Sequence, residues 1–207
     1  MVLIKRYTKV YVLIINIILL IFCSKKEGED YFPMSKGMRW EYSVQMLVPL
    51  VGTVKGKAIC RVDGIENIKG KKYFKLVFVP LEIPGAETEI EYCRKTKHGI
   101  YIIDSKYMDR PEELDIPFPT EIGSSWMEQI PIEGEFKKFN CRIEGFETLT
   151  LIDKEYKNCL KIRREAEGWM EKIEIIEYYA VNVGLVKSIF KGNGAIMEIN
   201  LEKYHRK

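Results

Sequence analysis

The feature that most constrains the fold is an alternation of apolar and polar residues with a period of two. It begins at 38–45, where Met, Trp, Tyr and Val alternate with Arg, Glu, Ser and Gln, and it recurs at 74–78, 160–163 and 197–202. Such a pattern is typical of half-buried strands in antiparallel sheets. Glycine-containing turns separate the segments, and no stretch of ten or more residues after the N-terminal segment combines a period of 3.6 with helix caps. The sequence therefore predicts an all-β antiparallel meander of about ten strands, with at most a turn of helix at 108–115.

The chain also contains an internal duplication. The pattern PxxxGxxW occurs at 33–40 and again at 119–126. Three further matches follow in the same order, separated like the first by 81 to 86 residues: CRVDGIE with CRIEGFE, IEY with IEY, and GIY with GLV. We infer two duplicated five-strand units, 31–106 and 115–206, within a single β domain that spans 31–207. The alternatives for their packing are a curved sheet, a half-barrel and a sandwich.

The shared start of the two units predicts four structural residues. Gly37 and Gly123 permit a backbone angle that other residues resist, and the preceding proline fixes the approach to the turn. Trp40 and Trp126 follow where each strand begins, and a large aromatic side chain there fills the end of the sheet. We expect these glycines and tryptophans to be paired structural anchors.

The N-terminal segment has the layout of an export signal. Three basic residues, with no acid, precede the apolar run 10–22, which is followed by Cys23 and a polar stretch. A helix formed by this run would be about 20 Å long, too short for a bilayer core of about 30 Å. We interpret residues 1–22 as a signal peptide.

The cysteine after LLIF resembles the lipobox of bacterial lipoproteins, although Phe22 stands where that motif has a small residue. The resemblance implies that Cys23 becomes the acylated N-terminal residue and that the membrane is a partner through this lipid. Residues 23–30 are then a lipidated flexible tether, because SKKEGED contains no apolar residue to bury. An uncleaved anchor and ordinary cleavage are the alternatives.

Four further cysteines follow Cys23. In an oxidising envelope they permit two disulfides. Cys60 and Cys141, however, occupy the apolar side of their strands, where a cysteine is usually a small buried hydrophobic residue. We expect thiols at these two positions, and the state of Cys93 and Cys159 stays open.

The chain after the signal segment resembles a loose group of bacterial envelope lipoproteins. YFPMSKGMRWEY at 31–42 is similar to their opening pattern YFPxxxGxxWxY, and YYAVNVGLVK at 178–187 is similar to their closing pattern YAxxVGLVK. YKNCLKI at 156–162 resembles their penultimate hairpin, whereas Asn182 stands where the pattern prefers Gly. The group has no assigned reaction. The resemblance therefore implies a membrane-anchored location in the cell envelope, facing the periplasm or the cell surface, and assigns no catalytic residue.

The sequence lacks the motifs of several function classes. Its two histidines, His98 and His205, lie far apart, and no HExxH, CxxC, Walker or GxSxG motif occurs. Three of the 33 Lys and Arg belong to the signal segment, so the remaining chain balances its 30 acids and bulk charge gives no reason to expect nucleic acid. We expect no catalytic residue, no metal site, no cofactor and no enzyme activity.

Carboxylates are the one catalytic resource that the chain offers. Glu87, Glu89 and Glu91 lie on one face of a predicted strand. Two carboxyl groups at that spacing are compatible with glycoside hydrolysis. Neighbouring rows of Lys and Arg favour charge pairs on a solvent-exposed face instead. A carboxylate-based envelope hydrolase is therefore the less favoured alternative.

We expect a non-enzymatic binding or scaffold module. A curved sheet without a covering helix must bury its dry face against itself, a ligand or a partner. Such a face would hold an apolar ligand or lipid on its concave side, or dock another envelope protein. The alternative is a structural or interaction protein without a ligand. The residues predicted to face a ligand occupy dry positions: Phe74, Leu76, Phe78, Tyr92 and Ile162.

Overall fold

The computed structural model describes residues 25–26, 29–83, 85–132, 135–167 and 172–206, and nearly all regular structure in them is β. One single-turn 3-10 helix, η1, interrupts the strands. The elements, in chain order, are β1 (Lys25–Lys26), β2 (Glu29–Asp30), β3 (Arg39–Val48), β4 (Gly52–Ile68), β5 (Lys71–Leu81), β6 (Glu89–Lys95), β7 (Gly99–Asp104), η1 (Ser105–Tyr107), β8 (Glu113–Pro117), β9 (Ser125–Ile132), β10 (Glu135–Leu151), β11 (Lys154–Glu167), β12 (Lys172–Ala180), β13 (Gly184–Gly192) and β14 (Ala195–His205).

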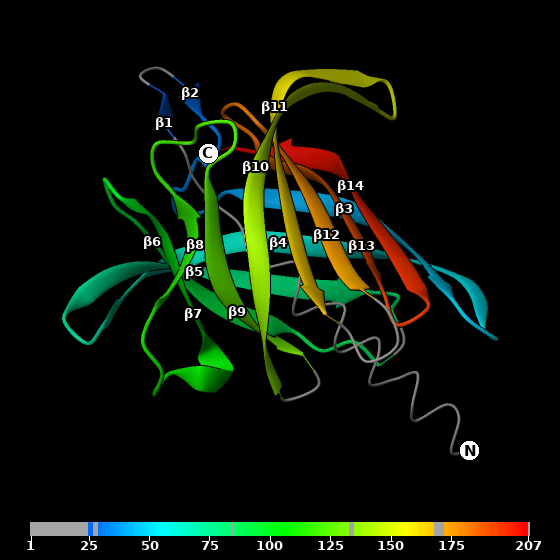
Figure 1. Ribbon diagram of the computed structural model, residues 1–207, viewed down its shortest axis with the longest axis horizontal. Helices are drawn as coiled ribbons and strands as arrows, with labels where there is room; N and C mark the ends of the chain where they lie inside the picture. Colours follow the sequence, from blue (N-terminus) through cyan, green and yellow to red (C-terminus); the bar gives the residue numbers. More distant parts are fainter. Residues whose placement is uncertain (1–24, 27–28, 84, 133–134, 168–171, 207) are drawn as a thin grey trace.

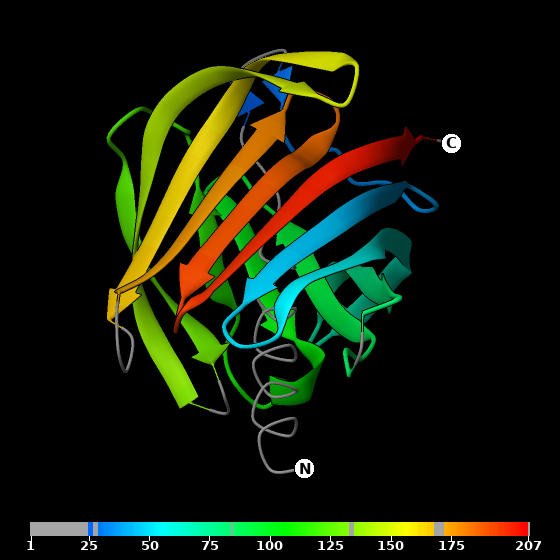
Figure 2. The same cartoon turned by 90° about the vertical axis from the view of Figure 1, so that its right-hand side faces the viewer.

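Twelve of these strands form one antiparallel sheet. Its order is β8-β7-β6-β5-β4-β3-β14-β13-β12-β11-β10-β9, so every hydrogen-bonded pair is consecutive in the chain except β3 with β14. The sheet curls until its two edge strands, β8 and β9, lie next to each other (Figures 1 and 2). The predicted all-β antiparallel meander is confirmed, and its form is a nearly closed barrel of twelve strands.

The two predicted units begin with the same strand register. Trp40 is the cross-strand partner of Cys60, and Trp126 is the partner of Cys141. The N–H of Gly37 donates to Val62 O at 2.9 Å, and that of Gly123 donates to Ile143 O at the same distance. Both glycines have positive φ, 86° and 89°, which only glycine adopts without strain. The two units thus begin with the same turn, and β14 joins the second unit to the first.

The barrel interior is filled by one large apolar cluster. Trp40 is completely buried, and its indole N–H donates to Val183 O at 2.6 Å, across the junction between the units. Trp126 is only partly buried, because β9 is an edge strand. The two tryptophans are therefore equivalent in register but not in burial. Cys60, Cys93, Cys141 and Cys159 are all buried and none forms a disulfide, as expected for the first and third.

Three expectations need correction. Glu89 and Glu91 were expected on the exposed face of their strand, but both are buried and point into the barrel. Tyr92 consequently points outward, into a small second cluster with Ile68, Tyr73 and Ile103. Near 108–115 the chain forms η1 and then the short strand β8. The sequence prediction assigns charged residues to the exposed face of a strand, and this rule fails where several charged side chains are buried together.

The N-terminal predictions lie largely outside the described residues. These include the signal peptide at 1–22 and the acylated Cys23. Of the expected tether, the structure describes Lys25–Lys26 and Glu29–Asp30, which pair as two short antiparallel strands. In the described part of the chain, no helix has the length and apolarity to span a bilayer.

The difference in tryptophan burial gives a stability prediction. Trp40→Ala should lower the free energy of unfolding by about 3–5 kcal/mol, the usual cost of removing a buried large aromatic side chain. Trp126→Ala should cost less, because part of its ring already contacts water. Urea denaturation of the two variants and the wild type measures both values. A larger loss for Trp126→Ala than for Trp40→Ala would contradict this assignment.

Candidate functional site

The seam between β8 and β9 is where the barrel departs from regular sheet structure. No backbone ladder joins these two strands in the described residues. Local sequence explains why both remain edges, since β8 is short and ends at Pro117 and β9 contains Pro131, and proline cannot donate to a ladder. What holds the edges together must therefore come from side chains.

A buried arginine crosses the seam from the inside. Arg164 on β11 is completely buried, and its Nη2 donates to Asp115 Oδ1 on β8 at 2.7 Å. Its Nη1 donates to a carboxylate oxygen of Glu128 on β9. Its Nε donates to Glu177 Oε2 on β12 at 2.9 Å. One guanidinium thus connects both edge strands with β11 and β12.

This cluster contains more acid than base. Burial raises the pKa of Glu128 to about 8 against the opposing effect of Arg164, and it raises that of Glu177 to about 7 in the same way. The pKa of Asp115 is also raised by burial. Burial alone would lower the pKa of Arg164, but the three carboxyl groups raise it well above its usual range. Near neutral pH the folded cluster therefore holds protons that the unfolded chain would release.

A second arginine closes the seam at its rim. Arg110, in the loop before β8, donates from Nη2 to Gln129 Oε1 on β9 at 3.0 Å, and the same nitrogen lies 3.6 Å from Glu113. Its guanidinium carbon lies 3.5 Å from the ring centroid of Phe136, a close cation–π contact. Tyr107 packs edge-on against the same ring, with centroids 4.8 Å apart.

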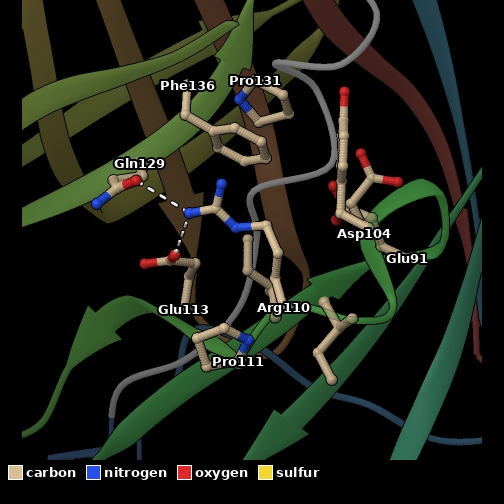
Figure 3. A pocket seen from close by; sticks show the side chains of 11 residues that line it. Glu91, Asp104, Arg110, Pro111, Glu113, Gln129, Pro131 and Phe136 are labelled. Carbon is tan, nitrogen blue, oxygen red and sulfur yellow. Dashed lines mark hydrogen bonds and ion pairs between the residues drawn. The ribbon is translucent and has the colours of Figure 1, made fainter. Parts of the chain in front are cut away.

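These rim residues border a small cleft of about 40 Å³ (Figure 3). Arg110 lies between Gln129 and Glu113 beneath the ring of Phe136, and Glu91 and Asp104 occupy the opposite wall. Glu91 is 5% exposed, and its Oε2 has no hydrogen-bond partner. Burial, followed by the nearby carboxylate of Asp104, raises the pKa of Glu91 well above its usual range. The cleft therefore joins apolar walls to a buried carboxyl group whose hydrogen bonding is incomplete.

The residues predicted to face a ligand have different surroundings. Leu76, Phe78 and Ile162 are completely buried in the apolar core, and Phe74 packs against it. Tyr92 lies on the outer surface of the barrel. Four of the five predicted positions thus share the interior, and other side chains already fill it.

The seam residues were missed by sequence reasoning. Arg164 lies in a run, KIRRE, that reads as a charged exposed strand. One signal was available: the repeat aligns Arg164 with Phe78, and an arginine at a core position requires buried acids.

Two further grooves on the molecule are open to solvent and are lined partly by lysines. One groove of about 440 Å³ is lined by residues including Lys137, Lys138 and Lys172, and another of about 350 Å³ by residues including Lys55 and Lys57. Within the described ranges, no group of three or more His, Cys, Asp or Glu is placed to hold a metal ion.

The buried carboxyls predict how stability depends on pH. Because their folded pKa values exceed the unfolded value near 4.3, the folded state binds extra protons, and the free energy of unfolding should fall as pH rises from 5 to 8. The slope is about 1.4 kcal/mol per pH unit for each extra proton. Glu177→Gln should make the slope shallower, since it removes one such group.

Glu198→Gln provides the matched control. Glu198 has a lowered pKa because it pairs with Lys187, so it does not titrate between pH 5 and 8 and the slope should stay that of the wild type. Urea denaturation at four pH values tests both variants. A wild-type stability that is flat or rises across this range would show that the cluster holds no extra protons.

Two solved structures are similar to this barrel. A protein from Bacteroides fragilis that has been inferred to be exported, and that has a YmcC-like fold, matches with a TM-score of 0.51 and 14% identity over 84% of this chain and 98% of its own. A protein from Parabacteroides distasonis that has been inferred to be a lipoprotein matches with a TM-score of 0.49 and 16% identity over 87% and 100%. No protein-family model and no curated protein sequence matches the chain. At 14% identity the likeness to the Bacteroides fragilis protein establishes the fold alone, and that fold is YmcC-like.

Proposed function

We propose that the chain is a cell-envelope lipoprotein, tethered through Cys23, whose barrel is a non-enzymatic binding or scaffold module. The observation that carries the binding role is the seam cleft, where an incompletely bonded buried carboxyl group meets aromatic and charged side chains. The export signal and the lipobox support the location. The Bacteroides fragilis protein of similar fold, which has been inferred to be exported, also supports it.

The seam is a better docking place than the concave interior. Leu76, Phe78 and Ile162 are fully buried by other core residues, so an apolar ligand on that face would have to displace side chains packed at ordinary density. The expected apolar ligand or lipid thus becomes the alternative within this proposal. A scaffold without a ligand is the other alternative.

The non-enzymatic role is favoured by how the carboxyls are used. Asp115, Glu128 and Glu177 face Arg164 inside the barrel, and none of the three lines the seam cleft. The glycosidase arrangement needs two carboxyls on either side of a bound sugar. Glu89 and Glu91 instead lie on one strand, within the barrel wall.

The lipid anchor has a direct test. Cys23→Ser should release the protein from the membrane fraction and abolish the mass added by the acyl chains, because stable attachment needs at least two chains. Fractionation and intact-protein mass spectrometry measure both effects. A Cys23→Ser protein that stays membrane-bound, with the processing and mass behaviour of the wild type, would refute acylation at this residue.

Docking at the seam is tested on protein purified from its own envelope. Native mass spectrometry should show a co-purified molecule or partner that is lost in Phe136→Ala, since Phe136 forms a wall of the cleft. Phe146→Ala is the matched control, because Phe146 is a partly exposed phenylalanine further along β10 and away from the cleft. Retention by Phe136→Ala together with loss in Phe78→Ala would move the site to the barrel interior.

A further inference from the structure

The internal repeat assigns Glu91 a structural counterpart. Glu91 is the cross-strand partner of Leu76, and Glu177 is the partner of Ile162, so the two IEY motifs place their glutamates at equivalent inward positions. Phe78 and Arg164 are equivalent in the same way, because they are the partners of Cys60 and Cys141. Glu177 thus has a guanidinium beside it, whereas Glu91 has a phenylalanine at the corresponding place.

The surroundings of Glu91 leave it short of hydrogen-bond donors. Asp104 lies directly opposite on β7, and carboxylates that face each other across two strands repel. Glu91 is only 5% exposed, and no donor within the described ranges reaches its Oε2 atom. A buried oxygen in this state costs free energy until a donor or a proton reaches it. Arg110 lines the cleft on the side opposite Glu91, and its guanidinium is already engaged by Gln129, Glu113 and Phe136.

We propose that the seam cleft binds a primary ammonium group, which Glu91 and Asp104 receive as Glu177 receives Arg164. This proposal rests on the seam being a docking site. The cleft of about 40 Å³ has room for roughly three water-sized groups, enough for an ammonium head and a short alkyl stem. Phe136, Ile102 and Pro111 supply apolar walls for the stem. The source is either a small free amine or the lysine side chain of a partner protein.

Two other ligand classes fit less well. An anion would meet the carboxyl groups of Glu91, Asp104 and Glu113. A divalent metal needs a fuller set of ligands than the described residues gather at one place. A purely apolar ligand would leave Glu91 Oε2 without a partner.

Binding should release a proton. Burial and the neighbouring acids raise the pKa of Glu91 well above its usual range, so the empty cleft retains a proton to higher pH than an ordinary carboxyl group and an ammonium ion must displace that proton. Affinity should therefore rise with pH, by up to tenfold per unit for one displaced proton. The carboxyl groups that act on Glu91 are Glu89 on β6, Asp104 on β7, Asp115 on β8 and Glu128 on β9. The thiol of Cys60 on β4 also faces Glu91, and Lys106 in η1 pairs with Glu89 at 3.5 Å.

The test uses the full chain and ethylammonium chloride as the probe. Isothermal titration at pH 8 should show binding, with ethanol as an uncharged analogue that does not bind. Glu91→Gln should weaken ethylammonium at least tenfold and should fold, because it replaces a buried carboxyl group with a neutral amide of the same shape. Asp104→Asn, with a weaker loss expected, covers the case in which Glu91→Gln does not fold. Glu198→Gln should bind as the wild type does.

The outcomes distinguish the two possible sources of the ammonium group, and they test this proposal separately from docking at the seam. Binding of N-acetyl-lysine amide as well as ethylammonium indicates a lysine of a partner, and binding of ethylammonium alone indicates a free amine. No binding of ethylammonium, or equal binding by Glu91→Gln, overturns the proposal and leaves a cleft that holds water only. In that case, a molecule that co-purifies with the wild type and is lost in Phe136→Ala would still support docking at the seam.

Discussion

The closed shape of this barrel depends on the guanidinium of Arg164. Eleven strand pairs are joined by backbone ladders, and the twelfth contact, between β8 and β9, is not. Arg164 bonds to Asp115 on one edge and Glu128 on the other, so removal of this side chain would leave three buried acids and no bond across the interior of the seam. Arg110 repeats the device at the rim with Gln129 and Glu113. A barrel closed in this way keeps two unpaired strand edges close to a cleft, which a fully laddered barrel would not.

Such a closure is expensive in desolvation. Moving an arginine and three carboxyl groups out of water costs several kcal/mol per ion, and their mutual attraction returns this only when the geometry is good. The cluster contributes position more than stability, because the guanidinium fixes β8, β9, β11 and β12 in one arrangement. The raised pKa values of Glu128 and Glu177 follow from the same burial. The stability of a seam closed by ionisable side chains therefore depends on pH. A seam closed by backbone hydrogen bonds would not have this dependence.

Particular residues show which parts of the fold could be predicted from the sequence. The alternation at 38–45 predicted β3 because one face of that strand is apolar throughout. The PxxxGxxW repeat predicted matching turns at Gly37 and Gly123, since turn geometry is local and only glycine suits it. The alternation rule places Glu89 and Glu91 on the wrong face because it treats every charged residue as exposed, whereas both are buried beside other carboxyl groups such as Asp104. The repeat alignment with Phe78 could have marked Arg164 as a core residue. The seam that Arg164 closes could not be predicted, since it depends on how far the sheet curls, and this is a property of all twelve strands together.

The duplication explains why only one half of the barrel offers the proposed ammonium site. Each unit brings an inward glutamate from its IEY motif, but only the second unit has an arginine at the position diagonal to it. In the second unit, Glu177 accepts a hydrogen bond from Arg164, the residue that closes the seam. In the first unit Phe78 fills the equivalent place, and Glu91 stays buried with an unbonded oxygen beside Asp104. The repeat thus places a buried carboxyl group in both units but a guanidinium in the second unit only. The small cleft lined by Glu91 is where a cation from outside the protein could take the place that the guanidinium has in the second unit.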